Sequence, residues 1–176
     1  MKRNGLVFNL VLAALFLALV YVMPFITMQI PEFGSMLLPM HIPVLLCGFI
    51  CGEKYGAAVG LIGPVTRSFM FSMPPLFPTA VAMSFELCAY GLLAALFRRI
   101  LPKHPLYIYP ALILAMLGGR IVWAIVSLIL YGIQGNEFTF TIMMNGAFFN
   151  AIPGIIVQIV IIPPIVMLAE RLLKKA

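Results

Sequence analysis

Long apolar stretches, separated by short polar or proline-bearing breaks, run along the whole chain. A helix needs about 20 apolar residues, within a range of about 17–25, to cross the hydrocarbon core of a membrane. The apolar stretches predict helices over Leu6–Ile26, His41–Cys51, Tyr55–Phe71, Thr79–Phe97, Tyr107–Tyr131 and Phe140–Leu173. The second and third are short for a full crossing. The pattern predicts an all-α integral membrane protein, with residues 1–176 forming one compact bundle of six transmembrane helices.

Proline and glycine mark the breaks between these helices. The run from Met73 to Pro78 contains three prolines and cannot be helical throughout, so it predicts a rigid loop. The third helix carries Gly56, Gly60 and Pro64, which predicts close packing against a neighbouring helix and a kink. Prolines in the last helix, at 153, 163 and 164, predict bends.

Composition supports a lipid environment. Hydrophobic residues make up 64% of the chain and charged residues 9%, whereas soluble domains carry about 25% charged residues. The net charge of +6 does not indicate nucleic-acid binding, because the basic residues form short clusters between apolar runs. Cys47, Cys51 and Cys88 lie in apolar segments without nearby His or Asp. We therefore expect buried, unpaired thiols and no metal site.

The basic residues also predict the orientation. Six crossings put both termini and the connections after the second and fourth helices on one side. Of the 11 Lys and Arg residues, all but Arg67 and Arg120 fall there: Lys2, Arg3, Lys54, Arg98, Arg99, Lys103, Arg171, Lys174 and Lys175. The opposite connections carry none and hold Glu32 and Glu137. Because cytoplasmic loops are enriched in Lys and Arg, both termini are predicted to be cytoplasmic.

Three charged residues remain within predicted helices: Arg67, Glu86 and Arg120. Each costs about 2.5–3.5 kcal/mol at a helix centre on insertion scales, so each is expected to face a partner or a wet cavity. The last helix adds Asn145, Asn150 and Gln158, and the second begins with His41. The predicted topology places these polar side chains in the outer half of the membrane above an apolar inner half. This distribution favours a cup that is open to the outside and sealed beneath, which binds a small solute.

Each candidate also has a structural explanation. Arg67 and Glu86 either contribute to a ligand site or form an ion pair between two helices. The two asparagines either contact ligand or bridge helices, and His41 either binds ligand or is a satisfied interfacial residue. Arg120 follows two glycines, where a ligand or a helix can approach closely. Two arginines against one glutamate give a charge of +1, which favours a carboxylate solute.

The first helix contains Ala14-x-x-x-Ala18, a spacing that lets another helix approach closely in lipid. Residues 38–46 read LPMHIPVLL, and glycines then recur every four residues from Gly48 to Gly60. With these features, the size and the six helices, nearly the whole chain resembles the substrate-binding (S) subunits of bacterial energy-coupling factor (ECF) transporters.

The resemblance implies a fold and a function. Such subunits capture a vitamin, a vitamin precursor or a metal ion from outside, and Ala14 and Ala18 are implied to dock on a membrane coupling subunit that joins two cytoplasmic ATPases. The chain contains no G-x-x-x-x-G-K-[ST] loop of its own. Metal-binding members carry N-terminal histidines, whereas this chain begins Met1-Lys2-Arg3, so cobalt or nickel is not expected.

Two other functions remain open. A stand-alone secondary transporter would show an internal repeat or polar residues that reach both faces, and neither is evident. An intramembrane enzyme would need an acid–base pair, for which Glu86 and His41 are candidates, but the chain has no H-E-x-x-H or G-x-S-x-G segment. We expect a non-enzymatic binding subunit without cofactors. Its substrate is expected to be a small water-soluble vitamin, with a weak preference for an anion such as pantothenate or nicotinate over a neutral pyridoxine-type compound.

Overall fold

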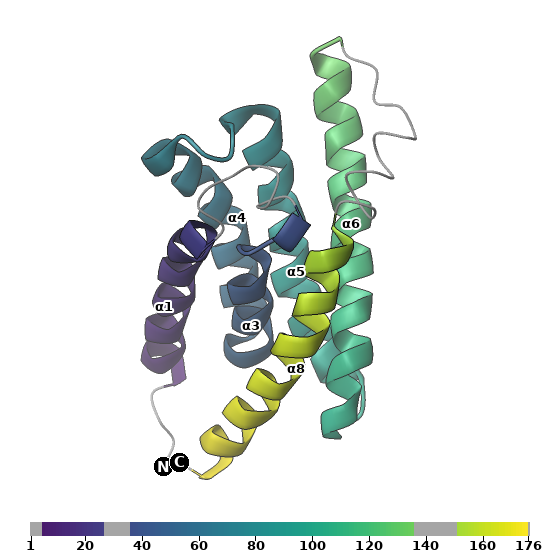
Figure 1. Cartoon of the computed structure of the whole chain (residues 1–176). Helices are drawn as coiled ribbons and strands as arrows, with labels where there is room; N and C mark the ends of the chain where they lie inside the picture. The colour runs from purple at the N-terminus through teal and green to yellow at the C-terminus, as the bar shows by residue number, and fades with distance from the viewer. Residues whose placement is uncertain (1–4, 27–35, 136–150, 176) are drawn as a thin grey trace.

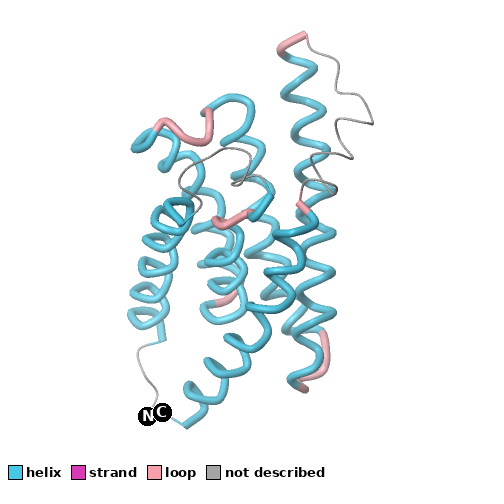
Figure 2. The backbone as a smooth tube through the Cα atoms, in the orientation of Figure 1, coloured by secondary structure: helices cyan, strands magenta, loops and turns pink. Residues whose placement is uncertain are grey.

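The computed structural model describes residues 5–26, 36–135 and 151–175, and this part of the chain is helical with short connections (Figures 1 and 2). A kinked turn, η1 (Leu76–Ala80), in which Phe77 has extended dihedral angles, precedes α5, and a 3₁₀ turn, η2 (Pro105–Tyr107), precedes α6. The six α-helices are α1 (Gly5–Ile26), α3 (His41–Cys51), α4 (Glu53–Phe71), α5 (Val81–Ile100), α6 (Ile108–Ile133) and α8 (Ile152–Lys175).

Four segments of the described chain are long and apolar enough to cross a membrane: Gly5–Phe25, Leu76–Ile100, Pro105–Ile133 and Ile152–Leu173. Helix α3 is apolar but has 11 residues, and α4 has 19 residues that include Glu53, Lys54 and Arg67. The predicted all-α membrane bundle is therefore confirmed, with two shorter helices set among four long ones.

Most helix ends match the sequence prediction within a few residues, and α3 matches it at both ends. Gly52, at a φ of 96°, ends α3 and lets α4 begin one residue later. The run from Met73 to Pro78 is not helical throughout, as predicted, because Phe77 has extended dihedral angles (φ −124°, ψ 132°), and α5 begins only at Val81. Helix α4 continues through Pro64, and α8 through Pro163 and Pro164. The first part of the predicted last helix, residues 140–150, lies outside the described residues.

Helix α5 packs against α3, α4 and α6 at the centre of the bundle, and glycines bring three of these helices together. A Cβ atom added at Gly48 would lie 2.4 Å from the Gly91 carbonyl oxygen, and one added at Gly91 would lie 2.2 Å from that of Gly56. A Cβ atom at Gly60 would lie 2.2 Å from the Leu87 oxygen. At these three positions a residue larger than glycine would not fit unless the backbone moved. The predicted close packing through glycines is confirmed.

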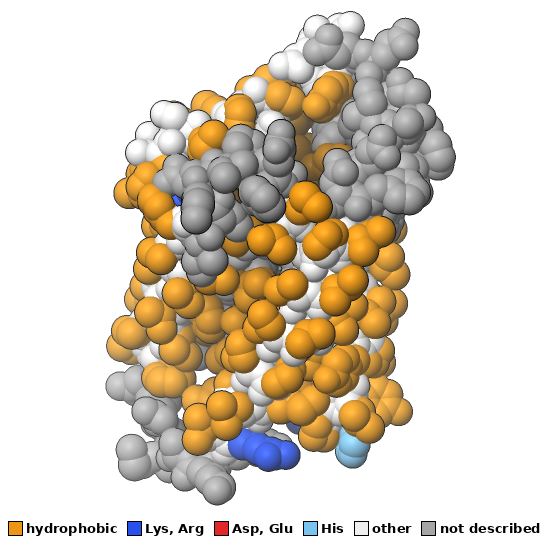
Figure 3. Space-filling view, viewed as in Figure 1, with side chains coloured by type: hydrophobic (Ala, Val, Ile, Leu, Met, Phe, Trp, Pro, Cys, Tyr) orange, Lys and Arg blue, Asp and Glu red, His pale blue; other side chains and the backbone are white. Residues whose placement is uncertain are grey.

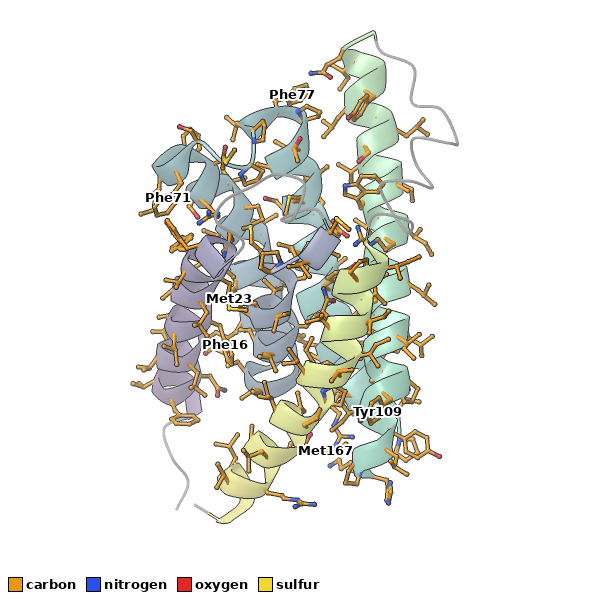
Figure 4. The ribbon with its side chains drawn as sticks, in the orientation of Figure 1. Phe16, Met23, Phe71, Phe77, Tyr109 and Met167 are labelled. Carbon is orange, nitrogen blue, oxygen red and sulfur yellow. The ribbon has the colours of Figure 1, made fainter. Side chains whose placement is uncertain are left out.

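Helix α1 packs on α3 and α4 through a narrow apolar stripe that includes Ala13, Phe16 and Val20, and Figure 4 shows Phe16 on the side of α1 that faces α3. Helix α8 packs on α3 and α6. Cys47 and Cys51 are buried free thiols in α3, as predicted, whereas Cys88 is only half-buried.

The beginning of α1, the end of α8 and the connection between α5 and α6 lie at the same end of the bundle (Figure 1). On the face drawn in Figure 3, hydrophobic side chains cover the flank, and most of the visible Lys and Arg surface lies at this same end. Helix α3, which starts with His41, begins at about mid-height of the bundle (Figure 1).

Candidate functional site

A buried ion pair joins α5 to α6. The Oε1 atom of Glu86 lies 2.9 Å from Nη1 of Arg120, and the two residues are 1% and 6% exposed. Glu86 lies in the second turn of α5, and Arg120 lies near the middle of α6. Because the two helices pack side by side, their two charges meet inside the bundle and away from lipid.

His41 and Tyr90 complete this cluster. The Nε2 atom of His41 lies 3.6 Å from Oε1 of Glu86, and His41 is 1% exposed. The His41 and Tyr90 rings meet edge to face, with 5.3 Å between their centroids. Tyr90 follows Glu86 by one turn of α5 and lies within side-chain hydrogen-bonding range of it. Gly119 makes room for the Tyr90 ring, since a Cβ atom there would lie 1.9 Å from it.

Several polar atoms in and near the cluster have no hydrogen-bond partner among the described residues. They are Nε and Nη2 of Arg120, both ring nitrogens of His41, Oε1 of Glu86, and both side-chain polar atoms of Gln158. Glu86 Oε1 still has the ionic contact with Arg120. A buried polar group left without a partner costs about 1–3 kcal/mol. Unused donors and acceptors on three neighbouring side chains, those of Arg120, His41 and Glu86, are typical of a site that a ligand or water completes.

An apolar cavity of about 180 Å³ adjoins the cluster between α5, α6 and α8. Arg120 and Tyr90 line it together with Ile113, Met116, Leu117, Ile155 and Ile159, and its surface is almost entirely apolar. Gln158 is fully buried on α8 between two turns that carry Ile155 and Ile159. A mostly apolar cavity with a few polar groups at one end is the usual form of a small-molecule site.

Arg67 lies away from this cluster, and the possible ion pair between Arg67 and Glu86 is not formed. Arg67 is 1% exposed, and its Nη1 donates to the backbone carbonyl of Tyr21. Its guanidinium lies 5.4 Å from the centre of the Phe25 ring and 4.9 Å from that of Phe71. Glu86 pairs with Arg120 instead. The physical reason is helix rotation: Arg67 is on the side of α4 that faces α1, whereas α5 carries Glu86 toward α6.

The structure thus brings together Glu86, Arg120 and His41 from the predicted set, and buries Gln158 nearby on α8. Asn145 and Asn150 lie outside the described residues. Tyr90 was not among the predicted site residues, although its spacing of four residues from Glu86 was a usable signal. The five apolar residues of the cavity wall were also missed, because nothing distinguishes them from other apolar residues in the sequence.

Comparison with known families places the chain in one class of protein. The family model described as the substrate-specific component of ECF transporters matches residues 8–166. The chain is an ECF S component. The match begins within α1, includes α3, α4, α5 and α6 in full, and ends within α8. The searches of curated proteins and of solved structures found no match.

An ECF S component is the solute-binding part of a transporter and not an enzyme, so the Glu86–His41 pair belongs to a binding protein. The chain is a multi-pass membrane protein, and proteins of this family bind small-molecule substrates and associate with a module of ATPases and a membrane coupling subunit. Among the described residues no group of three or more His, Cys, Asp or Glu side chains could hold a metal ion.

Proposed function

We propose that this S component captures a small water-soluble vitamin or vitamin precursor from outside the cell and releases it inward as part of an ATP-driven importer. The observation that supports this most directly is the Glu86–Arg120–His41 cluster at the end of an apolar cavity, with donors and acceptors left unused. We propose Glu86, Arg120, His41 and Gln158 as ligand-contacting residues, together with Asn145 and Asn150 from the sequence.

The position of Arg67 weakens the expected preference for an anion. That expectation was based on a charge of +1 from two arginines and one glutamate. With Arg67 held by the Tyr21 carbonyl and two aromatic rings, the cluster contains one glutamate and one arginine, whose charges balance. A solute such as pantothenate or nicotinate is then supported by the Arg120 guanidinium alone.

The outward face of α1 is a candidate docking surface for the coupling subunit. Ala14 and Ala18 are exposed, whereas Ala13 is buried against the rest of the bundle. Neighbouring Leu10 and Leu15 are 57% and 54% exposed. Small residues four apart on an otherwise apolar helix face allow close approach of a second helix in lipid. We propose that this face contacts the coupling subunit, which in turn engages two cytoplasmic ATPases.

We also propose that both termini are cytoplasmic, in a bacterial cytoplasmic membrane. Lys54, Arg98, Arg99, Lys103 and Arg171 belong to the connections and helix ends that share a side with the termini. The cluster would then open toward the outside, on the far side of an apolar inner half. This orientation suits capture of a solute from outside.

One experiment tests the function and the docking face together. The purified S component should bind a vitamin without ATP, and cells should accumulate that vitamin only when the coupling subunit and ATPases are co-expressed. Ala14→Leu should reduce co-purification of the coupling subunit about tenfold or more and leave solute binding unchanged. Ala58→Leu, at an exposed alanine of α4, is the matched control and should assemble normally.

Two results would contradict these proposals. Concentrative uptake by the chain alone would indicate a stand-alone secondary transporter. Normal assembly of the Ala14→Leu variant would remove the outward face of α1 from the interface.

A further inference from the structure

The charge balance of the cluster restricts what can occupy it. Glu86 and Arg120 are both at least nine-tenths buried and face each other at 2.9 Å. A carboxylate added beside them would need a further positive charge, which among the described residues of the cluster only His41 could supply, by binding a proton. An uncompensated charge is expensive in a low-dielectric interior, by several kcal/mol. An uncharged solute avoids this cost.

The hydrogen-bonding pattern of Arg120 restricts the solute further. Its Nη1 atom is used by Glu86, while Nε and Nη2 are buried and without partners among the described residues. These two atoms form the side edge of the planar guanidinium, with parallel N–H bonds that match two acceptors in one plane. A ring carbonyl next to an unprotonated ring nitrogen provides such acceptors without a charge, as O6 and N7 of guanine do toward arginine.

The α8 side of the site provides a matching group. Gln158 is 0% exposed, and both its Nε2 and its Oε1 lack partners in the described part of the chain. A side-chain amide has donors and an acceptor side by side, so it complements a ligand edge that itself contains both. A carboxylate contains acceptors only and would leave the Gln158 oxygen unsatisfied.

The space next to Arg120 suits a ring. The cavity of about 180 Å³ is lined by aliphatic and Met side chains apart from Tyr90 and Arg120. For comparison, an apolar cavity of about 150 Å³ in another protein accommodates benzene. A flat ring with its polar edge toward Arg120 would place its faces against Ile113, Leu117 and Ile159.

We propose that the solute is an uncharged, planar heterocycle whose ring carbonyl and neighbouring ring nitrogen accept hydrogen bonds from Nε and Nη2 of Arg120, with Gln158 as the second polar contact. This inference rests on the proposed function, because it assumes that the cluster is the solute site.

The test is an affinity selection with the purified full chain in lipid nanodiscs. The probes are matched neutral and anionic pairs (uracil and orotate, nicotinamide and nicotinate, pantothenol and pantothenate), guanine and hypoxanthine, and a protein-free small-molecule extract of bacterial cells. Each retained compound is identified by mass, and its charge by retention on an anion exchanger at pH 7. Arg120→Lys keeps the charge opposite Glu86 but removes the planar edge, and Gln158→Met keeps the length but removes the amide. Arg99→Lys is the control at an exposed arginine.

We expect a neutral heterocycle to be retained, with affinity reduced about tenfold or more by Arg120→Lys, reduced less by Gln158→Met, and unchanged by Arg99→Lys. Retention of an anion, or of a neutral compound whose affinity does not depend on Arg120, would overturn this inference and leave the capture function intact. Retention of nothing by the wild-type chain would instead count against the proposed function.

Discussion

Two arginines are buried in this bundle, and their surroundings differ. Arg67 is 1% exposed and donates to the Tyr21 carbonyl of α1 while two aromatic rings, Phe25 and Phe71, lie beside its guanidinium. Arg120 is 6% exposed and faces Glu86, but two of its three nitrogens have no partner among the described residues. The cavity adjoins Arg120 and not Arg67.

The difference shows which property identifies a binding site in a membrane bundle. Both arginines are costly to bury, so burial alone does not separate them. Arg67 joins α1 to α4, and the hydrogen bond of 2.7 Å between Tyr21 and Thr66 joins the same two helices. Arg120 retains unused donors next to an apolar space. The unused hydrogen-bonding capacity, and not the charge, distinguishes the site from the structural contact.

The largest expected effect comes from breaking the ion pair on one side only. Arg120→Met leaves Glu86 buried without its counter-charge, which should lower the free energy of unfolding by about 3–5 kcal/mol. Adding Glu86→Gln removes the second charge and should restore most of that loss. Denaturant unfolding of the single and double variants in the same detergent measures both effects.

A double variant as unstable as the single one would show that packing at Arg120, and not charge, stabilises this region. Because of this expected instability, solute binding is better tested with Arg120→Lys than with removal of the side chain.

A smaller effect is expected at the other arginine. Arg67→Ala removes the hydrogen bond to Tyr21 and the contacts with the Phe25 and Phe71 rings, and it leaves a space between α1 and α4. Loss of a large buried side chain costs about 2–5 kcal/mol, and we place this variant at about 2–4 kcal/mol of unfolding free energy. Its solute affinity, measured on the folded fraction, should equal that of the wild type. Arg99→Ala, at an exposed site, should change neither quantity.

A change of tenfold or more in solute affinity in the Arg67→Ala variant would contradict the separation between the two arginines. It would return Arg67 to the solute site, where its charge would again favour an anion.

The sequence predicted helix positions well, because lipid requires long apolar segments and because proline and glycine mark where they end. Helix α3, between Pro39 and Gly52, matched at both ends. The glycines at 56 and 60 were correctly expected to pack closely, since a spacing of four residues places them on one face of α4. These properties depend on local sequence, which is available without knowledge of the neighbouring helices.

The partners of the buried charges could not be predicted in the same way. Sequence and topology give the depth of a residue in the membrane, whereas partners depend also on the rotation of each helix about its axis. Arg67 and Glu86 were expected at similar depths, yet they face different neighbours. His41 joined the cluster because α3 begins at about mid-height of the bundle, which no local pattern indicates.

The smallest effect is expected at a third arginine, near the end of the bundle that holds the end of α8. Arg98 donates from Nε and Nη2 to the two carboxylate oxygens of Glu170, at 2.7 Å each, and so joins the end of α5 to α8. The Arg98 and Glu170 side chains are 11% and 29% exposed, so water and salt weaken the pair. Glu170→Gln should therefore cost about 0.5–1 kcal/mol of unfolding free energy at low salt and less at 1 M NaCl. Solute affinity should not change, because Arg98 follows Glu86 by 12 residues, about 18 Å along the helix.

A loss of unfolding free energy above about 2 kcal/mol that persists at high salt would show that this pair behaves as a buried one. Arg98 would then belong with Arg67, as a second buried arginine whose guanidinium joins two helices.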